Sequence, residues 1–280
     1  MGTPLDDLVD LLDLEAIEVN IFRGRQPDED RQRVFGGQVA GQALVAAART
    51  VEGDRPVHSL HAYFLRPGDP RVPILYDVDR IRDGRSFTTR RVVAIQHGRA
   101  IFNLQASFHV VEEGLDHADE MPEVPAPDGL QTFKERFAPV AHLMGDWYHR
   151  PRPIDTRWVD DPIRLNPEPR TTQRVWLRAD GRLPDDPVVH ACVLTYASDM
   201  TLLDTTLLPH GRSWDDGVQM ASLDHAMWFH RPFRADDWLL YDQRSPSASG
   251  ARGLAQGSIF TAEGDLAVSV VQEGLIRPAR

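Results

Sequence analysis

The sequence contains a single cysteine, Cys192, and a single lysine, Lys134. One cysteine excludes an internal disulfide and a cysteine-based metal cluster, and its apolar neighbours predict an inert, buried thiol. No run approaches the ~18 apolar residues of a membrane-spanning helix, so we expect no insertion into a membrane. The first residues carry Asp6, Asp7 and Asp10 and no basic residue, which is not the composition of a secretory signal. We therefore expect a cytoplasmic protein.

Basic residues are fewer than acidic residues. The chain has 31 Lys and Arg residues against 42 Asp and Glu residues, which gives a net charge of −11. This balance repels nucleic acids and anionic membrane surfaces, so we expect no nucleic-acid partner. An anionic ligand would have to meet arginines locally, against the overall charge.

Several catalytic motifs are missing. The glycines of the 36–41 segment resemble a phosphate loop, but the Lys-Ser/Thr pair that grips phosphate does not follow them. Neither the dinucleotide fingerprint Gly-x-Gly-x-x-Gly nor the hydrolase elbow Gly-x-Ser-x-Gly occurs. His225 and His230 have the wrong spacing for two metal ligands on one helical face. We expect neither a metal ion nor another cofactor.

The chain contains an internal repeat, which is a fold-level signal. A Ser-Leu pair, an Arg-Pro pair and a Leu-Tyr-Asp triplet follow one another at 59–77 and again at 222–242. The spacing from Arg66 to Tyr76 equals that from Arg231 to Tyr241. An ordered series of matches indicates a duplication.

Each copy has the same predicted order of elements. Helix-like runs occupy 37–51 and 190–203, with apolar residues at helical spacing. The strand-like runs are 17–23, 57–65, 74–81, 87–96 and 100–110 in the first copy, and 173–178, 220–230, 238–243, 251–261 and 266–276 in the second. This order predicts an α+β protein made of two tandem antiparallel sheets, each wrapped around a long central helix.

The segment between the copies is rich in proline and acidic residues and is typical of a linker, with a short helix predicted at 130–137. We therefore divide the chain into an N-terminal unit at 1–114, a linker at 115–152 and a C-terminal unit at 153–280.

The two predicted helices differ in their chemistry. The first begins at Gly36-Gly37, where bare backbone N–H groups could approach a ligand oxygen. The second carries Asp199, where the first has Leu44. We infer a composite site at the interface of the copies, with an oxyanion donor from one and an acid or base from the other. The glycines can instead form a turn or allow close packing of the helix against a sheet, and Asp199 can cap a following helical turn or face solvent.

Five stretches carry a resemblance to a known family: 33–38, 57–68, 83–87, 223–232 and 271–274. Over about residues 14–278, the chain resembles the acyl-CoA thioesterase II family, the TesB-like enzymes. The resemblance implies a double hotdog fold and the hydrolysis of acyl-CoA thioesters to coenzyme A and a fatty acid.

The resemblance also implies a catalytic trio, Asp199, Ser222 and Gln272, all in the second copy. A carboxylate can take a proton from water, and the hydroxyl and amide can orient that water. Direct attack by Asp199, which would form an anhydride, stays an alternative. The backbone N–H near Gly37 is the expected oxyanion donor.

Acyl-CoA is then the expected partner, and its phosphates require cations. Arg85 and Arg252 are the candidates for substrate binding, beside Arg90 and Arg91, although any of these can be a solvated surface arginine. Because hotdog sheets commonly pair, we also expect that the chain can form a homo-oligomer. Two other functions stay open, an acyl-CoA hydratase or dehydratase and a non-catalytic acyl-CoA-binding protein.

Overall fold

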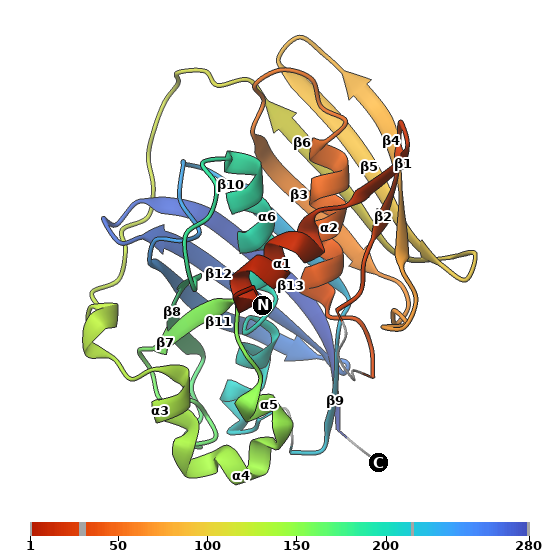
Figure 1. Cartoon of the computed structure of the whole chain (residues 1–280). Coiled ribbons are helices and arrows are strands. Elements are labelled where there is room, and N and C mark those ends of the chain that lie inside the picture. The colour runs from red at the N-terminus through yellow and green to blue at the C-terminus, as the bar shows by residue number, and fades with distance from the viewer. Residues whose placement is uncertain (1, 28–31, 214–215, 279–280) are drawn as a thin grey trace.

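The structure, a computed structural model, describes residues 2–27, 32–213 and 216–278. Within these residues, thirteen strands form one continuous antiparallel sheet in the order β1-β2-β4-β5-β6-β3-β10-β13-β12-β11-β8-β7, with β9 paired to β13 (Figure 1). The strands are β1 Glu15–Glu18, β2 Ile21–Gly24, β3 Val57–Phe64, β4 Ile74–Asp83, β5 Phe87–Gln96, β6 Arg99–His109, β7 Ile154–Trp158, β8 Thr172–Ala179, β9 Val218–Ser222, β10 Asp224–Phe229, β11 Leu239–Ser249, β12 Arg252–Thr261 and β13 Leu266–Pro278.

The sheet consists of two halves with the same strand order. The halves join where β3 and β10 pair, with Tyr63 opposite Asp224 and Leu60 opposite Met227. Outward from this seam, β6, β5, β4, β2 and β1 mirror β13, β12, β11, β8 and β7. The predicted double hotdog architecture is confirmed, and its two sheets are fused edge to edge into one.

Two long helices, α2 Gly36–Ala48 and α6 Pro187–Ser198, lie side by side against this sheet (Figure 1). Both are buried around most of their circumference, as expected for helices enclosed by sheet and by one another. A Cβ on Gly41 would lie 3.2 Å from the Cys192 carbonyl oxygen, so the helix axes approach closely there. The other helices are short: α1 Pro4–Leu12, η1 Pro127–Gly129, α3 Phe133–Phe137, η2 Ala138–Val140, α4 Ala141–Met144, α5 Asp146–His149, η3 Leu203–Thr206 and η4 Leu208–His210.

The boundaries of α6 differ from the prediction. The helix begins at Pro187 because Asp186 caps it: the Asp186 carboxylate accepts from the Val188 N–H at 2.9 Å. It ends at Ser198, with Asp199 as its C-cap. The pairing of Asp199 with Leu44 was therefore wrong, because Leu44 lies inside α2 and the C-cap of that helix is Arg49.

Two predicted strands are each divided in the structure. The run 17–23 forms the β1–β2 hairpin, and the run 220–230 is interrupted at Leu223, between β9 and β10. The Leu223 N–H donates to Glu273, and its carbonyl oxygen accepts from the Phe64 N–H, each at 2.9 Å. Both β9 and β10 pair antiparallel with β13, and the register shifts by one residue across Leu223, with Ser222 opposite Gly274 and Ala226 opposite Val271. Such a β-bulge directly after Ser222 is an irregularity of the kind often found beside active sites.

The connection between the halves is extended after β6 and then forms short helices packed around Phe133, Phe137 and Met144. Helix α3 lies inside the predicted 130–137 segment, whereas β7 was not predicted. The limits at 114 and 152 stay predictions. Among the described residues, no helix is both long and apolar enough to cross a membrane.

Candidate active site

The junction of the two long helices positions Asp199. A Cβ on Gly36 would lie 2.6 Å from Asp199 Oδ2, and one on Gly37 would collide with the Tyr196 carbonyl oxygen. Only glycines therefore allow the first turn of α2 to reach the end of α6. The glycines thus allow close packing against a second helix, not against the sheet as the alternative had it, and the same approach brings the Gly37 N–H to Asp199.

The three residues of the predicted trio lie together. Gln272 Nε2, from β13, donates to Asp199 Oδ1 at 2.6 Å. Ser222 Oγ, at the end of β9, donates to the same oxygen at 3.4 Å. Strands β9 and β13 are paired neighbours, with Ser222 opposite Gly274, so both side chains come from adjacent positions of the sheet.

One of the two polar side-chain atoms of Gln272 has no partner among the described residues. Its side chain is fully buried, and its Nε2 faces Asp199. The Oε1 atom consequently points elsewhere and finds no hydrogen-bond donor among the described residues. Buried amide oxygens without a partner are rare, and one beside a carboxylate is suited to accept a hydrogen bond from a water or a ligand.

Burial raises the pKa of Asp199 to about 6. Three hydrogen bonds oppose this effect by favouring the charged form, and they come from Gln272, from the Gly37 backbone N–H and from Ser222. The resulting pKa suits a general base at neutral pH, because the carboxylate is mostly ionised yet binds a proton better than an exposed one does.

The Gly37 N–H was expected to face a substrate oxygen. In the structure it donates to the Asp199 carboxylate, at the positive end of the α2 dipole. This N–H therefore helps to hold the Asp199 carboxylate in its position.

Arg33 is a site residue that the sequence analysis did not single out, although it belongs to the 33–38 stretch. Its Nη2 donates to the Met220 carbonyl oxygen on β9 at 3.1 Å, and its charge lowers the pKa of Asp199. The guanidinium thus connects the segment before α2 with the strand that carries Ser222.

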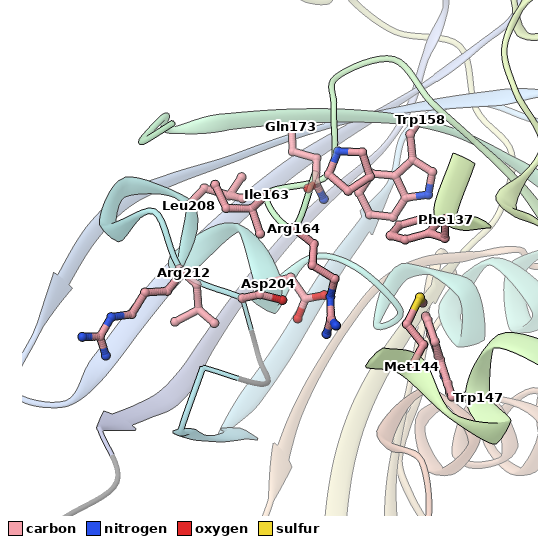
Figure 2. A pocket seen from close by; sticks show the side chains of 13 residues that line it. Phe137, Met144, Trp147, Trp158, Ile163, Arg164, Gln173, Asp204, Leu208 and Arg212 are labelled. Carbon is pink, nitrogen blue, oxygen red and sulfur yellow. The ribbon is translucent and has the colours of Figure 1, made fainter. Parts of the chain in front are cut away.

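A second buried acid, Asp204 on η3, lies in a cavity beside this site. Figure 2 shows its carboxylate with the Arg164 guanidinium, in a space whose other walls include Phe137, Met144 and Trp147. Burial, followed by the negative charge of Asp199, raises the pKa of Asp204 to about 7, and Arg164 opposes the shift. No sequence motif marks Asp204.

The two arginines predicted to bind substrate lie apart from this cluster or have another partner. Arg85 is exposed in the β4–β5 turn, and its carbonyl oxygen accepts from Arg55. That turn adjoins the C-terminal end of α2, about 20 Å along the helix from Gly36. Arg252 donates to Glu273 Oε1 at 3.0 Å, and strand alternation places this ion pair on the sheet face opposite to that of Gln272.

Arg90 and Arg91 also have structural partners. Arg90 is 1% exposed and donates to Thr50 through Nε and Nη2, each at 2.8 Å. Arg91 forms an exposed ion pair with Asp79 at 3.3 Å.

The histidines and the cysteine show no arrangement for metal binding. His225 is buried against Ser198 Oγ at 2.9 Å, and burial lowers its pKa to about 4, so the ring is neutral at pH 7. Burial raises the pKa of the Cys192 thiol, which makes it a poor nucleophile. The described part of the chain holds no group of three or more His, Cys, Asp or Glu side chains that could bind a metal.

Comparison with known proteins shows the family of this chain. A model described as acyl-CoA thioesterase matches residues 163–275, and one described as acyl-CoA thioesterase N-terminal domain matches residues 26–109. The chain is 43% identical to acyl-coenzyme A thioesterase 8 of Homo sapiens, over 99% of this chain and 92% of the human protein. The chain belongs to the acyl-CoA thioesterase family.

Two bacterial members of the acyl-CoA thioesterase family support the same assignment. Acyl-CoA thioesterase 2 of Haemophilus influenzae is 40% identical over 99% of both chains. The crystal structure of acyl-CoA thioesterase II TesB2 from Mycobacterium marinum is 46% identical, covers 97% of both chains and superposes with a TM-score of 0.81. The predicted family, the hotdog fold and the prediction of a thioester hydrolase are confirmed.

Proposed function

We propose that this enzyme hydrolyses acyl-CoA thioesters with Asp199 as general base. The observation that carries this proposal is the short bond from Gln272 to Asp199 Oδ1, which leaves Oδ2 and the Gln272 Oε1 atom to share one water molecule. Two acceptors fix the orientation of that water and direct its lone pair at the thioester carbon.

The reaction then follows from proton balance. Asp199 takes a proton from the water as its oxygen bonds to the carbonyl carbon, and the carbon–sulfur bond breaks in the tetrahedral intermediate. The proton held on Asp199 passes to the departing thiolate, which gives a carboxylic acid and free coenzyme A. A positioned base of this kind contributes about 10²–10⁴-fold to the rate.

Gly37 has a double role in this proposal. Its N–H aligns Asp199 in the free enzyme, and the positive end of the α2 dipole faces the oxygen that becomes negatively charged in the transition state. Ser222, whose bond to Asp199 is longer, completes the orientation of the carboxylate.

A thiol-release assay over acyl-CoA chain lengths tests the function. Thiol release supports hydrolysis, hydration of an enoyl-CoA without thiol release would indicate a hydratase, and binding without turnover would indicate a carrier. A single turnover in oxygen-18 water tests the mechanism. General-base catalysis labels only the product acid, whereas an anhydride at Asp199 leaves the label in the protein.

The expected cytoplasmic location and the homo-oligomer stay predictions.

A further inference from the structure

Coenzyme A carries phosphates, and this acidic chain must bind them with local cations. Arg252 is neutralised by Glu273, Arg90 is fully buried, and Arg85 lies at the far end of α2. A different set of cations gathers elsewhere on the described surface. A groove of about 440 Å³ lies between α3 and β7, and its lining includes Lys134, Arg150, Arg152 and Arg157.

This groove, called the arginine groove below, has a surplus of positive charge. Leaving aside Arg150, which has another interaction, three cations line it against two carboxylates, Asp155 and Asp180. Asp155 is already paired with Arg157. Its volume is within the range of small-molecule sites, and the Phe133 ring and two threonines, Thr132 and Thr156, are among its other walls.

Arg152 is the residue that points to an anionic ligand. Its guanidinium lies 3.6 Å from the centre of the Phe133 ring and 4.2 Å from that of Trp147, and Nη2 donates to the Trp147 carbonyl oxygen. Its Nε is buried without an acceptor, and no carboxylate pairs with it among the described residues. Burial lowers its pKa to about 10. A half-buried cation without a counter-ion is costly, and a bound phosphate would relieve that cost.

One ring contact and two charge interactions connect the arginine groove with the surroundings of Asp199. Arg152 is within electrostatic reach of Tyr196, one helical turn before Asp199. Trp147, on which Arg152 stacks, also lines the cavity that holds Asp204 (Figure 2). The charge of Asp199 acts on Asp204. A flexible pantetheine arm could therefore run from Asp199 past Trp147 to Arg152.

We propose that the arginine groove binds the phosphate groups at the nucleotide end of acyl-CoA, with Arg152 as the central contact and Lys134 at the exposed rim. This inference rests on the proposed function, since it assigns a subsite for the same substrate.

The test compares two substrates with the same acyl group. Octanoyl-CoA carries the phosphates, and octanoyl-N-acetylcysteamine has the same thioester without them. In Arg152→Gln we expect kcat/KM for octanoyl-CoA to fall about 10–100-fold, mainly through KM, with the N-acetylcysteamine substrate changed less than about twofold. Lys134→Glu, an exposed position, should show the same selectivity at about 3–10-fold.

The controls separate the alternatives. Arg99→Gln, an exposed arginine at the start of β6, should leave kcat/KM unchanged for both substrates. Equal losses on both substrates, or no loss in either groove variant, would overturn the proposal. So would selective losses in Arg85→Gln or Arg252→Gln in place of the groove variants. If Arg152→Gln does not fold, Lys134→Glu decides.

Two further measurements separate this proposal from other outcomes. Adenosine 3′,5′-bisphosphate should inhibit the wild type competitively against octanoyl-CoA, and a non-competitive pattern or equal inhibition by inorganic phosphate would contradict a nucleotide subsite. A wild type that releases thiol from no acyl-CoA in the chain-length series would refute the proposed function itself, whereas cleavage without groove selectivity would refute only the subsite.

Discussion

Ala106 in the first half of the sheet occupies the place that Gln272 occupies in the second. The Arg-Pro pairs make Ala62 equivalent to Met227, and these residues pair with Leu104 and Val270. Two positions further along each strand are Ala106 and Gln272. The cross-strand neighbour of Ala106 is Arg90, and that of Gln272 is Ala255. The large polar residue of this cross-strand pair is therefore Arg90 on β5 in the first half and Gln272 on β13 in the second, and these strands are not equivalent.

In each half, a polar side chain of the sheet contacts the C-terminal end of the long helix. In the second half Gln272 reaches Asp199 at the C-cap of α6, and in the first Arg90 reaches Thr50, just beyond the C-cap of α2. The first half thus keeps the contact between sheet and helix but has a buried guanidinium instead of the acid. We infer one catalytic site per chain.

Arg90→Met should destabilise the protein without affecting catalysis. The substitution leaves the Thr50 hydroxyl and carbonyl without their donor and removes the bond to Asp83 at 2.5 Å. We expect the free energy of unfolding, measured by urea denaturation, to fall by about 2–4 kcal/mol, because the guanidinium is buried. The kcat of the folded fraction should change less than about twofold. A large fall in kcat with unchanged stability would place Arg90 in the active site.

Asp199→Asn should inactivate the enzyme and stabilise its fold. Without the base we expect kcat to fall about 10²–10⁴-fold with little change in substrate binding. Since the folded pKa, about 6, lies above the usual 3.8, the ionised acid opposes folding, and stability is lost as the pH rises from about 4 to 6. The variant should therefore be more stable than the wild type at pH 8, by about 1–3 kcal/mol, and equally stable at pH 3. Thermal unfolding at both pH values measures this, and unchanged turnover would end the proposed mechanism.

Arg33→Gln should move the acidic limb of the pH profile upward. The wild-type kcat/KM should fall below a pKa of about 6, where Asp199 becomes protonated. Loss of the nearby positive charge removes an effect that favours the carboxylate, so the pKa of Asp199 rises. The variant should be impaired most at pH 6 and recover toward pH 8. Arg99→Gln is the matched control, and a uniform loss at every pH would indicate that Arg33 acts on binding or folding instead.

Gln272→Ala should be more damaging than Ser222→Ala. The amide makes the 2.6 Å bond to Asp199 and also carries the unpartnered Oε1, whereas the hydroxyl makes a bond of 3.4 Å. We expect kcat to fall about 10²–10³-fold for the first variant and about tenfold or less for the second. Ser222→Thr keeps the hydroxyl and should retain activity. Equal effects of the two alanine variants would contradict the assigned order.

The sequence predicted the order of helices and strands better than it predicted helix ends and strand irregularities. The repeat and the helical and alternating patterns predicted both long helices and most strands, because they reflect which faces are buried. Asp186-Pro187 is a recognisable helix start signal, whereas the apolar periodicity alone predicted a start at residue 190. The bulge at Leu223, directly after Ser222, has no such signal because it depends on bonds to Glu273 and Phe64.

The three residues of the trio were predicted through family resemblance. The distances between their side chains could be obtained only from the folded structure. Arg33 and Asp204 could not be assigned from the sequence, since one acts through the pairing of distant segments and the other through burial in a cavity beside Asp199. For the arginines, the sequence offered too many candidates for substrate binding. Composition made all of them equivalent, and only the structure separates the buried Arg90 from the exposed Arg85 and from Arg152, which lacks a counter-ion among the described residues.

Gly36→Ala should disable the site while leaving the fold intact. The new methyl group would lie 2.6 Å from Asp199 Oδ2 and 2.9 Å from the Phe64 ring, so the carboxylate must move by about 1 Å. Such a displacement of a catalytic group lowers kcat about 10–100-fold. Because both contacts are side chains that can shift, the thermal midpoint should fall only slightly. Gly129→Ala, where a Cβ would meet nothing within 4 Å, is the matched control and should leave kcat unchanged. Full activity in Gly36→Ala would show that Asp199 does not need its present position, and the general-base geometry would fail.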